Sequence, residues 1–228
     1  MIIGGIQKNS FIDYPGKIST VIFLSGCNFT CPYCHNLALA QNTPPCIIPE
    51  KDALDFLERR RHLIEGVVLS GGEPTLEPKL LSLCRRIKAM GYRLKLDTNG
   101  SRPAVLEMLI REEILDYVAM DIKTDLAGYS RLWPRKNGGD IIQRSVRMLL
   151  AGSIPFEFRT TCVPPFVTVE NAEEIGRLIA GAPRYYLQKD SRHDVINPPA
   201  SAYAHSCRID LEKLKTILSP YVVSCSIR

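Results

Sequence analysis

An apolar run leads directly into a loop with three cysteines in the sequence Val21-Ile22-Phe23-Leu24-Ser25-Gly26-Cys27-Asn28-Phe29-Thr30-Cys31-Pro32-Tyr33-Cys34-His35-Asn36. The cysteines have the spacing C-x3-C-x2-C, and no fourth cysteine lies near them in the sequence. Cysteine thiolates hold iron–sulfur clusters, and a four-iron cluster without an open position needs four of them. Three thiolates therefore predict a cluster with one iron left to bind a substrate and pass it an electron.

Zinc held by the three cysteines and His35 is an alternative interpretation of this loop. Zinc ligands usually arrive as two spaced pairs from separate elements, however, whereas His35 directly follows Cys34. Disulfides are a second alternative, but we expect the chain to be cytoplasmic, where thiols stay reduced. We favour the iron–sulfur interpretation.

The chain has 228 residues, a formal net charge of +5 and an apolar fraction of 45%. This size fits one domain, or one domain with small additions, and allows a sizeable core. The longest apolar runs fall far short of the roughly 20 residues that cross a bilayer, and we recognise no signal peptide at the start. The modest charge does not indicate nucleic acid. We therefore expect a cytoplasmic protein that binds neither membrane nor nucleic acid.

Strand-like apolar runs alternate with amphipathic, helix-like stretches along the chain. This alternation is typical of a parallel sheet covered by helices, curled by right-handed crossovers. Six units are too few for a closed eight-unit barrel, so we predict an α/β fold, a partial, open (β/α)6 TIM-like barrel. The predicted strands are 19–25, 66–69, 92–97, 117–122, 155–161 and 185–188, and the predicted helices are 52–62, 77–90, 102–111, 139–150, 169–180 and 210–218.

We expect these elements to form a single domain over residues 1–228. A small N-terminal β-element is expected at 1–18, the barrel core at 19–190 and a C-terminal extension at 191–228, in which a short terminal strand falls near 221–225.

Polar and glycine-rich residues gather where the predicted strands end. In parallel βα architectures the active site lies at the C-terminal ends of the strands. Turns favour Gly, Asn and Asp for steric reasons alone, so only the recurrence of such residues is informative. Their positions predict a site for a polar, zwitterionic molecule, built from the cysteine loop, Ser70-Gly71-Gly72-Glu73-Pro74, Asp97-Thr98-Asn99-Gly100, Asp121 with Lys123, Arg159 and Gln188.

The cysteine loop and the Ser70–Pro74 segment together resemble the radical S-adenosylmethionine (SAM) superfamily. Four further stretches resemble the glycyl-radical-enzyme activating enzymes, most closely the activating protein of the anaerobic ribonucleoside-triphosphate reductase, and also the pyruvate formate-lyase activating enzyme. The stretches are Ile12-Asp13-Tyr14-Pro15-Gly16-Lys17, Gly26-Cys27-Asn28, Cys31-Pro32-Tyr33-Cys34-His35-Asn36 and Leu96-Asp97-Thr98-Asn99-Gly100.

This resemblance implies an oxidoreductase with one [4Fe–4S] cluster on Cys27, Cys31 and Cys34. SAM would bind the fourth iron, and one-electron cleavage would give a 5′-deoxyadenosyl radical. That radical would take a Cα hydrogen from a glycine of a partner enzyme and so install a glycyl radical under anaerobic conditions. The electron would come from reduced flavodoxin or ferredoxin.

The resemblance also implies contacts with SAM near the cysteine loop and the second strand. Tyr33 matches an aromatic position against the adenine, with loop packing as the alternative. The backbone of His35 matches a SAM-contacting position, although the imidazole can simply cap the loop. Gly71, Gly72 and Glu73 match the segment that meets the methionine amino group.

Further contacts are implied at the remaining strand ends. Asp97, with Asn99, matches a group near the ribose or a bound monovalent cation, and a buried turn acceptor is the alternative. Lys123 and Arg159 match basic positions that meet the SAM carboxylate, with a structural ion pair to Asp121 as the alternative. Gln188 ends the sixth strand.

Two other functions remain open from the sequence. A radical SAM enzyme can act on a small molecule, such as a deazapurine precursor, instead of a protein. A zinc-stabilised interaction or nucleic-acid module is a rival of another class. The cysteines outside the loop show no ligand spacing, and we expect them to be packing residues: Cys46, Cys84, Cys162, Cys207 and Cys225.

Overall fold

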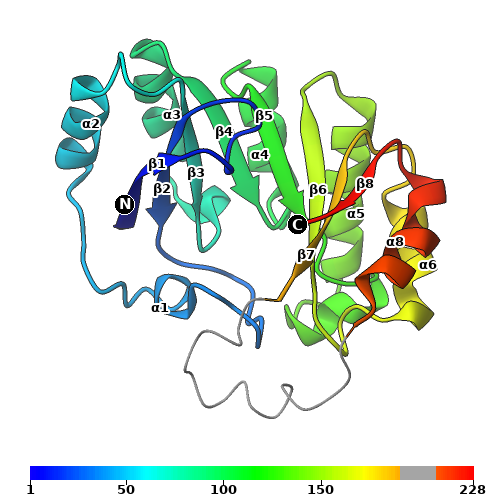
Figure 1. Ribbon diagram of the computed structural model, residues 1–228. Helices are drawn as coiled ribbons and strands as arrows, with labels where there is room; N and C mark the ends of the chain where they lie inside the picture. Colours follow the sequence, from blue (N-terminus) through cyan, green and yellow to red (C-terminus); the bar gives the residue numbers. More distant parts are fainter. Residues whose placement is uncertain (191–208) are drawn as a thin grey trace. The chain divides into compact units, whose positions relative to one another are not determined.

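The computed structural model describes residues 1–190 and 209–228. The chain forms two compact units. Unit 1 comprises Met1–Asn28, Asn36–Thr98 and Ala104–Ala119, and unit 2 comprises Phe29–His35, Asn99–Pro103 and Met120–Arg228. Eight strands are hydrogen-bonded in the order β1 to β8, so the sheet follows the chain and is open (Figure 1). The predicted open α/β architecture is confirmed.

Unit 1 begins with the predicted N-terminal β-element. Strand β1 (Ile3–Ser10) pairs antiparallel with β2 (Ser19–Leu24), which pairs parallel with β3 (Gly66–Gly71), and β3 pairs parallel with β4 (Arg93–Thr98). Strand β5 (Tyr117–Asp121) starts in this unit. The helical segments are α1 (Leu37–Ala40), α2 (Glu50–Arg59), η1 (Pro74–Leu76), α3 (Leu80–Ala89) and α4 (Pro103–Arg111).

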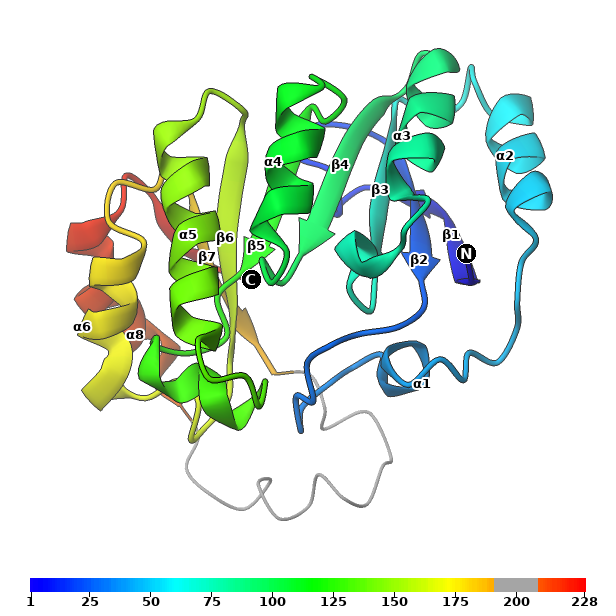
Figure 2. The ribbon, with the colours of Figure 1, turned by 180° about the vertical axis from the view of Figure 1, so that it is seen from behind.

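The core of unit 1 follows from burial of both faces of its parallel strands. Val67, Val68 and Leu69 in β3 are fully buried, the continuous apolar pattern of a strand covered on both sides. Helix α3 turns Leu80, Leu83, Cys84 and Ile87 inward at helical spacing. Figure 2 shows α3 and α4 over one face of β3 and β4.

In unit 1, four buried side chains from separate elements form an apolar layer. Val21 of β2, Val68 of β3 and Tyr117 of β5 pack with Tyr14 from the loop after β1, and all four are at most 5% exposed. The rings of Tyr14 and Tyr117 are 6.0 Å apart. The N-terminal element thus contributes Tyr14 to the core.

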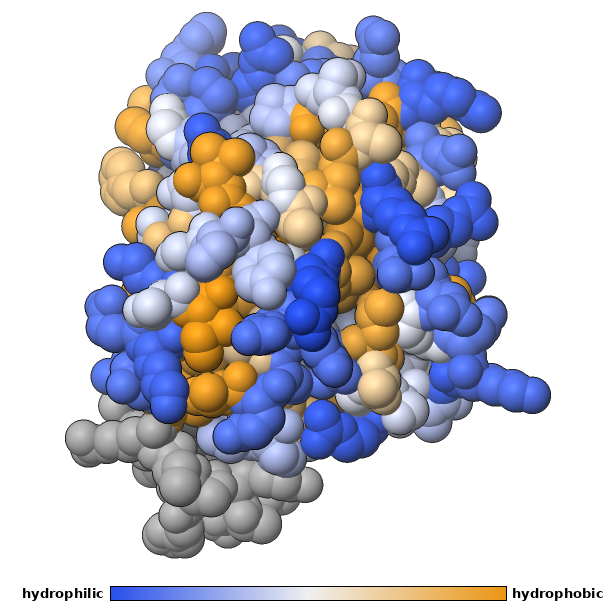
Figure 3. Space-filling model, turned by 90° about the vertical axis from the view of Figure 1, so that its right-hand side faces the viewer, coloured by the Kyte–Doolittle hydropathy of each residue, from blue (hydrophilic) through white to orange (hydrophobic). Residues whose placement is uncertain are grey.

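Unit 2 carries the parallel strands β6 (Phe156–Cys162), β7 (Tyr185–Lys189) and β8 (Cys225–Ile227). In Figure 2, α5 and α6 lie over one face of β6 and β7, and α8 lies beside α6. Figure 3 views the side of Figure 1 on which α6 and α8 lie and shows apolar residues interspersed with hydrophilic ones. The helical segments are η2 (Ala127–Arg131), α5 (Gly138–Ala151), α6 (Val169–Leu178), α8 (Leu211–Leu218) and η5 (Ser219–Tyr221).

All six predicted strands and six predicted helices are present, with ends shifted by up to three residues. The terminal strand lies at Cys225–Ile227, later than predicted, because the preceding residues form η5 and a turn. Helix α1 was not predicted. Residues 191–208 of the expected extension, with Cys207, lie outside the described residues. No helix in the described residues is long and apolar enough to cross a membrane.

Candidate cluster and cofactor site

The first cysteine of the loop belongs to unit 1, where its backbone is fixed by hydrogen bonds. The Gly26 amide donates to the Leu39 carbonyl at 2.7 Å, and the Cys27 amide donates to the Ala40 carbonyl at 3.1 Å. Helix α1, which contains both carbonyls, therefore positions Cys27 beyond the end of β2.

The second and third cysteines belong to unit 2. The amide and hydroxyl of Thr30 both donate to the Leu132 carbonyl, at 2.9 and 3.2 Å. The Phe29 ring packs against Trp133 and Tyr129, with centroids 5.2 and 6.0 Å away. The Cys34 amide closes a turn onto the Cys31 carbonyl at 3.1 Å. Residues 129–133 thus anchor this part of the loop, a role that the sequence did not reveal.

Tyr33 is 2% exposed and packs against Leu132, Val163 and Phe166, with Cys31 at the edge of this cluster. Its ring centroid is 5.3 Å from that of Phe166. Burial raises the pKa of Tyr33 well above its ordinary range, so the phenol stays neutral. The aromatic ring is therefore rigidly held next to Cys31.

The donor chemistry of the loop fits an iron–sulfur cluster. Cys27, Cys31 and Cys34 are partly buried, and no described cysteine forms a disulfide. Among the described residues, no three His, Cys, Asp or Glu side chains are gathered so that they could hold a metal ion. The exposed His35 faces Asp190, with Nε2 and Oδ1 3.8 Å apart, which gives the Cys3His zinc alternative no support.

Gly71 and Gly72 lie against the backbone that precedes the first cysteine. Gly71 has a φ of +121°, and a Cβ there would lie 2.2 Å from the Leu24 carbonyl oxygen. A Cβ on Gly72 would lie 2.1 Å from the Gly26 carbonyl oxygen. The Glu73 amide donates to that same oxygen at 2.8 Å. Glycine is needed here because the end of β3 touches the backbone leading into Cys27.

Glu73 has a buried side chain that organises unit 1. Its Oε1 accepts from the Thr75 amide at 3.1 Å, from the Thr75 hydroxyl at 2.5 Å and from the Thr98 hydroxyl at 2.7 Å. These bonds cap η1 and tie it to the end of β4. The carboxylate thus has a structural task besides the contact predicted for this segment.

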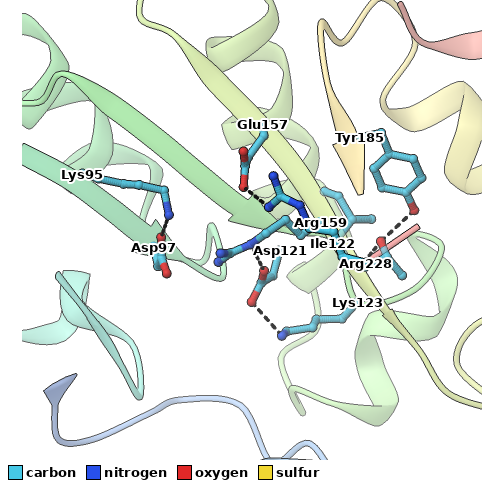
Figure 4. Close-up of polar contacts among 10 residues, drawn as sticks. Lys95, Asp97, Asp121, Ile122, Lys123, Glu157, Arg159, Tyr185 and Arg228 are labelled. Atoms are coloured by element: carbon cyan, nitrogen blue, oxygen red, sulfur yellow. Dashed lines mark hydrogen bonds and ion pairs between the residues drawn. The ribbon is translucent and has the colours of Figure 1, made fainter. Parts of the chain in front are cut away.

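The predicted residues at the end of β4 have distinct partners. Asp97 Oδ1 accepts from Lys95 Nζ at 2.5 Å, and both side chains are buried (Figure 4). Asn99 Oδ1 accepts from the Ser101 amide at 2.9 Å and so forms the turn. This turn bond concerns Asn99, and the turn-acceptor alternative for Asp97 stays a prediction. Lys95 was not predicted, because a lysine in a strand usually points to solvent.

In unit 2, Lys123 and Arg159 converge on Asp121 (Figure 4). Lys123 Nζ lies 2.9 Å from Asp121 Oδ2, and Arg159 Nε lies 3.1 Å from Oδ1. Burial opposes the charge of Asp121, but the two cations outweigh it and lower the pKa of Asp121 to about 2. Burial also opposes the charge of Lys123, yet Asp121 leaves the pKa of Lys123 above its ordinary value. Lys123 and Arg159 thus together stabilise the ionised form of the Asp121 carboxylate.

Gln188 is partly buried in β7, paired in register with Thr161 of β6. Tyr129 is a neighbour of Lys123 that the sequence did not single out. Its fully buried hydroxyl accepts from the Lys123 amide at 3.1 Å, and burial raises the pKa of Tyr129. Tyr129 therefore connects Lys123 with the aromatic anchor of the cysteine loop.

A parallel βα sheet, a loop with three thiols and the cations Lys123 and Arg159 fit an iron–sulfur enzyme of the partial-barrel class. The chain belongs to the radical SAM superfamily, whose family model matches residues 21–180. The cofactors of this superfamily are a [4Fe–4S] cluster and SAM, as predicted.

Two relatives narrow the family further. The chain is 32% identical over 234 residues to a Methanocaldococcus jannaschii protein provisionally named a glycyl-radical enzyme activating enzyme. This match covers 100% of this chain and 95% of that protein. It is 28% identical to the pyruvate formate-lyase-activating enzyme of Clostridium pasteurianum, over 78% of this chain and 75% of that protein.

The fold has counterparts among solved structures. A radical SAM methyltransferase from Sphaerobacter thermophilus matches with a TM-score of 0.68 and 20% identity, over 96% of this chain and 68% of that chain. At this identity the match concerns the fold alone.

Proposed function

We propose that this protein is a cytoplasmic activase that cleaves SAM reductively and installs a glycyl radical on a partner enzyme under anaerobic conditions. We further propose that the partner is the anaerobic ribonucleoside-triphosphate reductase, with a pyruvate formate-lyase-type enzyme as the alternative. The observation that carries the proposal is the full-length similarity to a protein named as an activating enzyme. The stretches Ile12–Lys17 and Leu96–Gly100 support the choice of reductase.

The proposed roles follow from donor chemistry and charge. Cys27, Cys31 and Cys34 would hold the cluster, which with bound SAM supplies the 5′-deoxyadenosyl radical. Lys123 and Arg159 would meet the carboxylate of SAM, because they are two cations gathered around one carboxylate, that of Asp121.

The remaining predicted contacts surround the rest of SAM. Tyr33 would present its ring to the adenine, and the backbone of His35 would lie nearby. Gly71, Gly72 and the Glu73 backbone would meet the methionine ammonium. Asp97 and Asn99 would lie near the ribose, and Gln188 would be a further contact.

The test is electron paramagnetic resonance of the candidate partner after incubation with iron-loaded protein, SAM and a reductant under anaerobic conditions. The proposal predicts a glycyl radical doublet that requires SAM and is absent when the protein is left out. Formation of 5′-deoxyadenosine without a doublet on either candidate partner would contradict it. If deuterium instead passes from a labelled small molecule into 5′-deoxyadenosine, the enzyme acts on small molecules.

For the electron donor we propose an acidic carrier, reduced flavodoxin or ferredoxin. Arg131, Arg135 and Lys136 are exposed on the segment that anchors the Cys31–Cys34 part of the loop. The ion pairs between described residues include none of these three cations. An acidic carrier docked there would approach the cluster ligands of unit 2, and complementary charge would raise its association rate.

Reversing one of these charges should weaken reduction by a carrier protein. We expect Lys136→Glu to raise the KM for reduced flavodoxin about threefold, with the rate under dithionite unchanged. Arg131 and Arg135 are spared because their guanidinium groups pack 5.1 Å and 5.2 Å from the ring centroids of Phe166 and Trp133. The control is Lys213→Glu on α8, which makes the same charge change elsewhere in unit 2. Equal KM values for the two variants would contradict the proposed docking site.

A further inference from the structure

Lys95 is a buried lysine that none of the roles above explains. Its side chain is 1% exposed, and its Nζ lies 2.5 Å from Asp97 Oδ1 (Figure 4). Residues two apart in a strand point to the same face, so β4 itself sets these two groups side by side. In the ion pairs between described residues, Asp97 is the partner of Lys95.

The surroundings of Lys95 explain why it needs this partner. Its neighbour in register on β3 is Val68, which belongs to the apolar layer with Tyr14, Val21 and Tyr117. An ammonium group next to such a layer loses hydration that apolar side chains cannot replace. A carboxylate at hydrogen-bond distance offsets that loss, so Lys95 and Asp97 form a buried ion pair.

This pairing bears on the role of Asp97. A lone carboxylate near the ribose would attract a cation from solution, and a bound monovalent cation is one of the roles implied by resemblance. Here the positive charge is already supplied by the chain. An ammonium group and an alkali ion carry the same charge, and both contact carboxylate oxygen. The Lys95 ammonium can therefore take the place of an alkali ion beside Asp97.

We propose that Lys95 is the built-in counter-ion of Asp97, that it positions this carboxylate for SAM, and that SAM binding therefore needs no Na⁺ or K⁺. Lys95 is a positioning residue, since it acts through Asp97. The inference rests on the proposed function, because it concerns the affinity for SAM. It departs from the expectation of a bound monovalent cation.

The first test needs no variant. SAM is titrated calorimetrically into the anaerobic, iron-loaded protein in NaCl, KCl or tetramethylammonium chloride at equal ionic strength. Tetramethylammonium is too bulky to replace an alkali ion on a buried carboxylate. The inference predicts dissociation constants that agree within about twofold in the three salts. An affinity at least about tenfold higher in NaCl or KCl would overturn it.

The second test removes the charge. Lys95→Met keeps an unbranched side chain, and we expect it to weaken SAM binding about tenfold in tetramethylammonium chloride, with partial recovery in NaCl or KCl. Lys95→Arg should retain most of the affinity. The control is Lys51→Met, because Lys51 lies on the surface and pairs with Asp55 at 2.8 Å. Unchanged affinity of Lys95→Met in every salt would overturn the inference.

The outcomes separate this inference from the proposed function. If SAM binding depends on an alkali ion, the proposed role of Lys95 is wrong, whereas the proposed activase function is unaffected. If SAM binding is independent of the salt but no partner gains a glycyl radical, the proposed activase function is wrong, whereas the role of Lys95 as counter-ion is unaffected. If Lys95→Met does not fold, the salt series on the unaltered protein still decides.

Discussion

Replacing Cys31 by Ala is expected to abolish both cluster assembly and SAM cleavage. Removing one of the three thiolates would leave a second iron of a four-iron cluster without a protein ligand. Iron and sulfide should fall to background after anaerobic reconstitution, and 5′-deoxyadenosine formation should fall by roughly a thousandfold or more, equivalent to about 4 kcal/mol of activation free energy. Metal analysis and chromatography of the reaction products measure the two quantities.

The control for this variant is Cys46→Ala. Cys46 is exposed and outside the loop, with its sulfur 3.8 Å from the Gly4 carbonyl oxygen. Its removal should leave iron content and SAM cleavage unchanged. Normal iron loading in Cys31→Ala, or an equal loss of iron in Cys46→Ala, would contradict the assignment of the loop cysteines as cluster ligands.

Replacing Gly72 by Ala should have the second-largest effect on iron loading. It would act by displacing the backbone next to Cys27, since Gly72 is not a cluster ligand. The added methyl group would lie 2.1 Å from the Gly26 carbonyl oxygen and 3.3 Å from the Cys27 nitrogen. Both are main-chain atoms, so the strand end or the cysteine loop must move. We expect the free energy of unfolding to drop by about 1–3 kcal/mol or more, and iron loading to fall because Cys27 is displaced.

Gly5→Ala is the matched control, since a Cβ there would meet Phe23 at an ordinary 3.6 Å. It should keep full iron loading and the unfolding midpoint of the unaltered protein. Denaturant unfolding with parallel iron analysis compares the two variants. If they behave alike, the close approach at Gly72 does not support the cysteine loop.

The sequence predicted the elements of this fold because their patterns are local. The buried run Val67–Leu69 and the helical spacing of Leu80, Leu83 and Ile87 are visible without tertiary information. The terminal strand was predicted too early, because Tyr221-Val222-Val223 is a strand-like apolar run, whereas Val223 is exposed and precedes β8.

The candidate site residues were chosen from spacing and strand ends, and their binding roles stay predictions. The structure adds the partners of these residues, which the sequence did not give. The Lys95–Asp97 pair depends on which face of β4 points inward, and the Thr98 to Glu73 bond joins residues 25 positions apart. Contacts of this kind arise from packing of separate strands, which no motif records.

Mössbauer spectroscopy of the anaerobically reconstituted, ⁵⁷Fe-labelled protein, before and after addition of SAM, tests the central claim most directly. A four-iron cluster on Cys27, Cys31 and Cys34 leaves one iron without a thiolate, and that iron alone should change its spectrum when SAM binds. Absence of a four-iron cluster, or a cluster whose four irons all ignore SAM, would contradict the account.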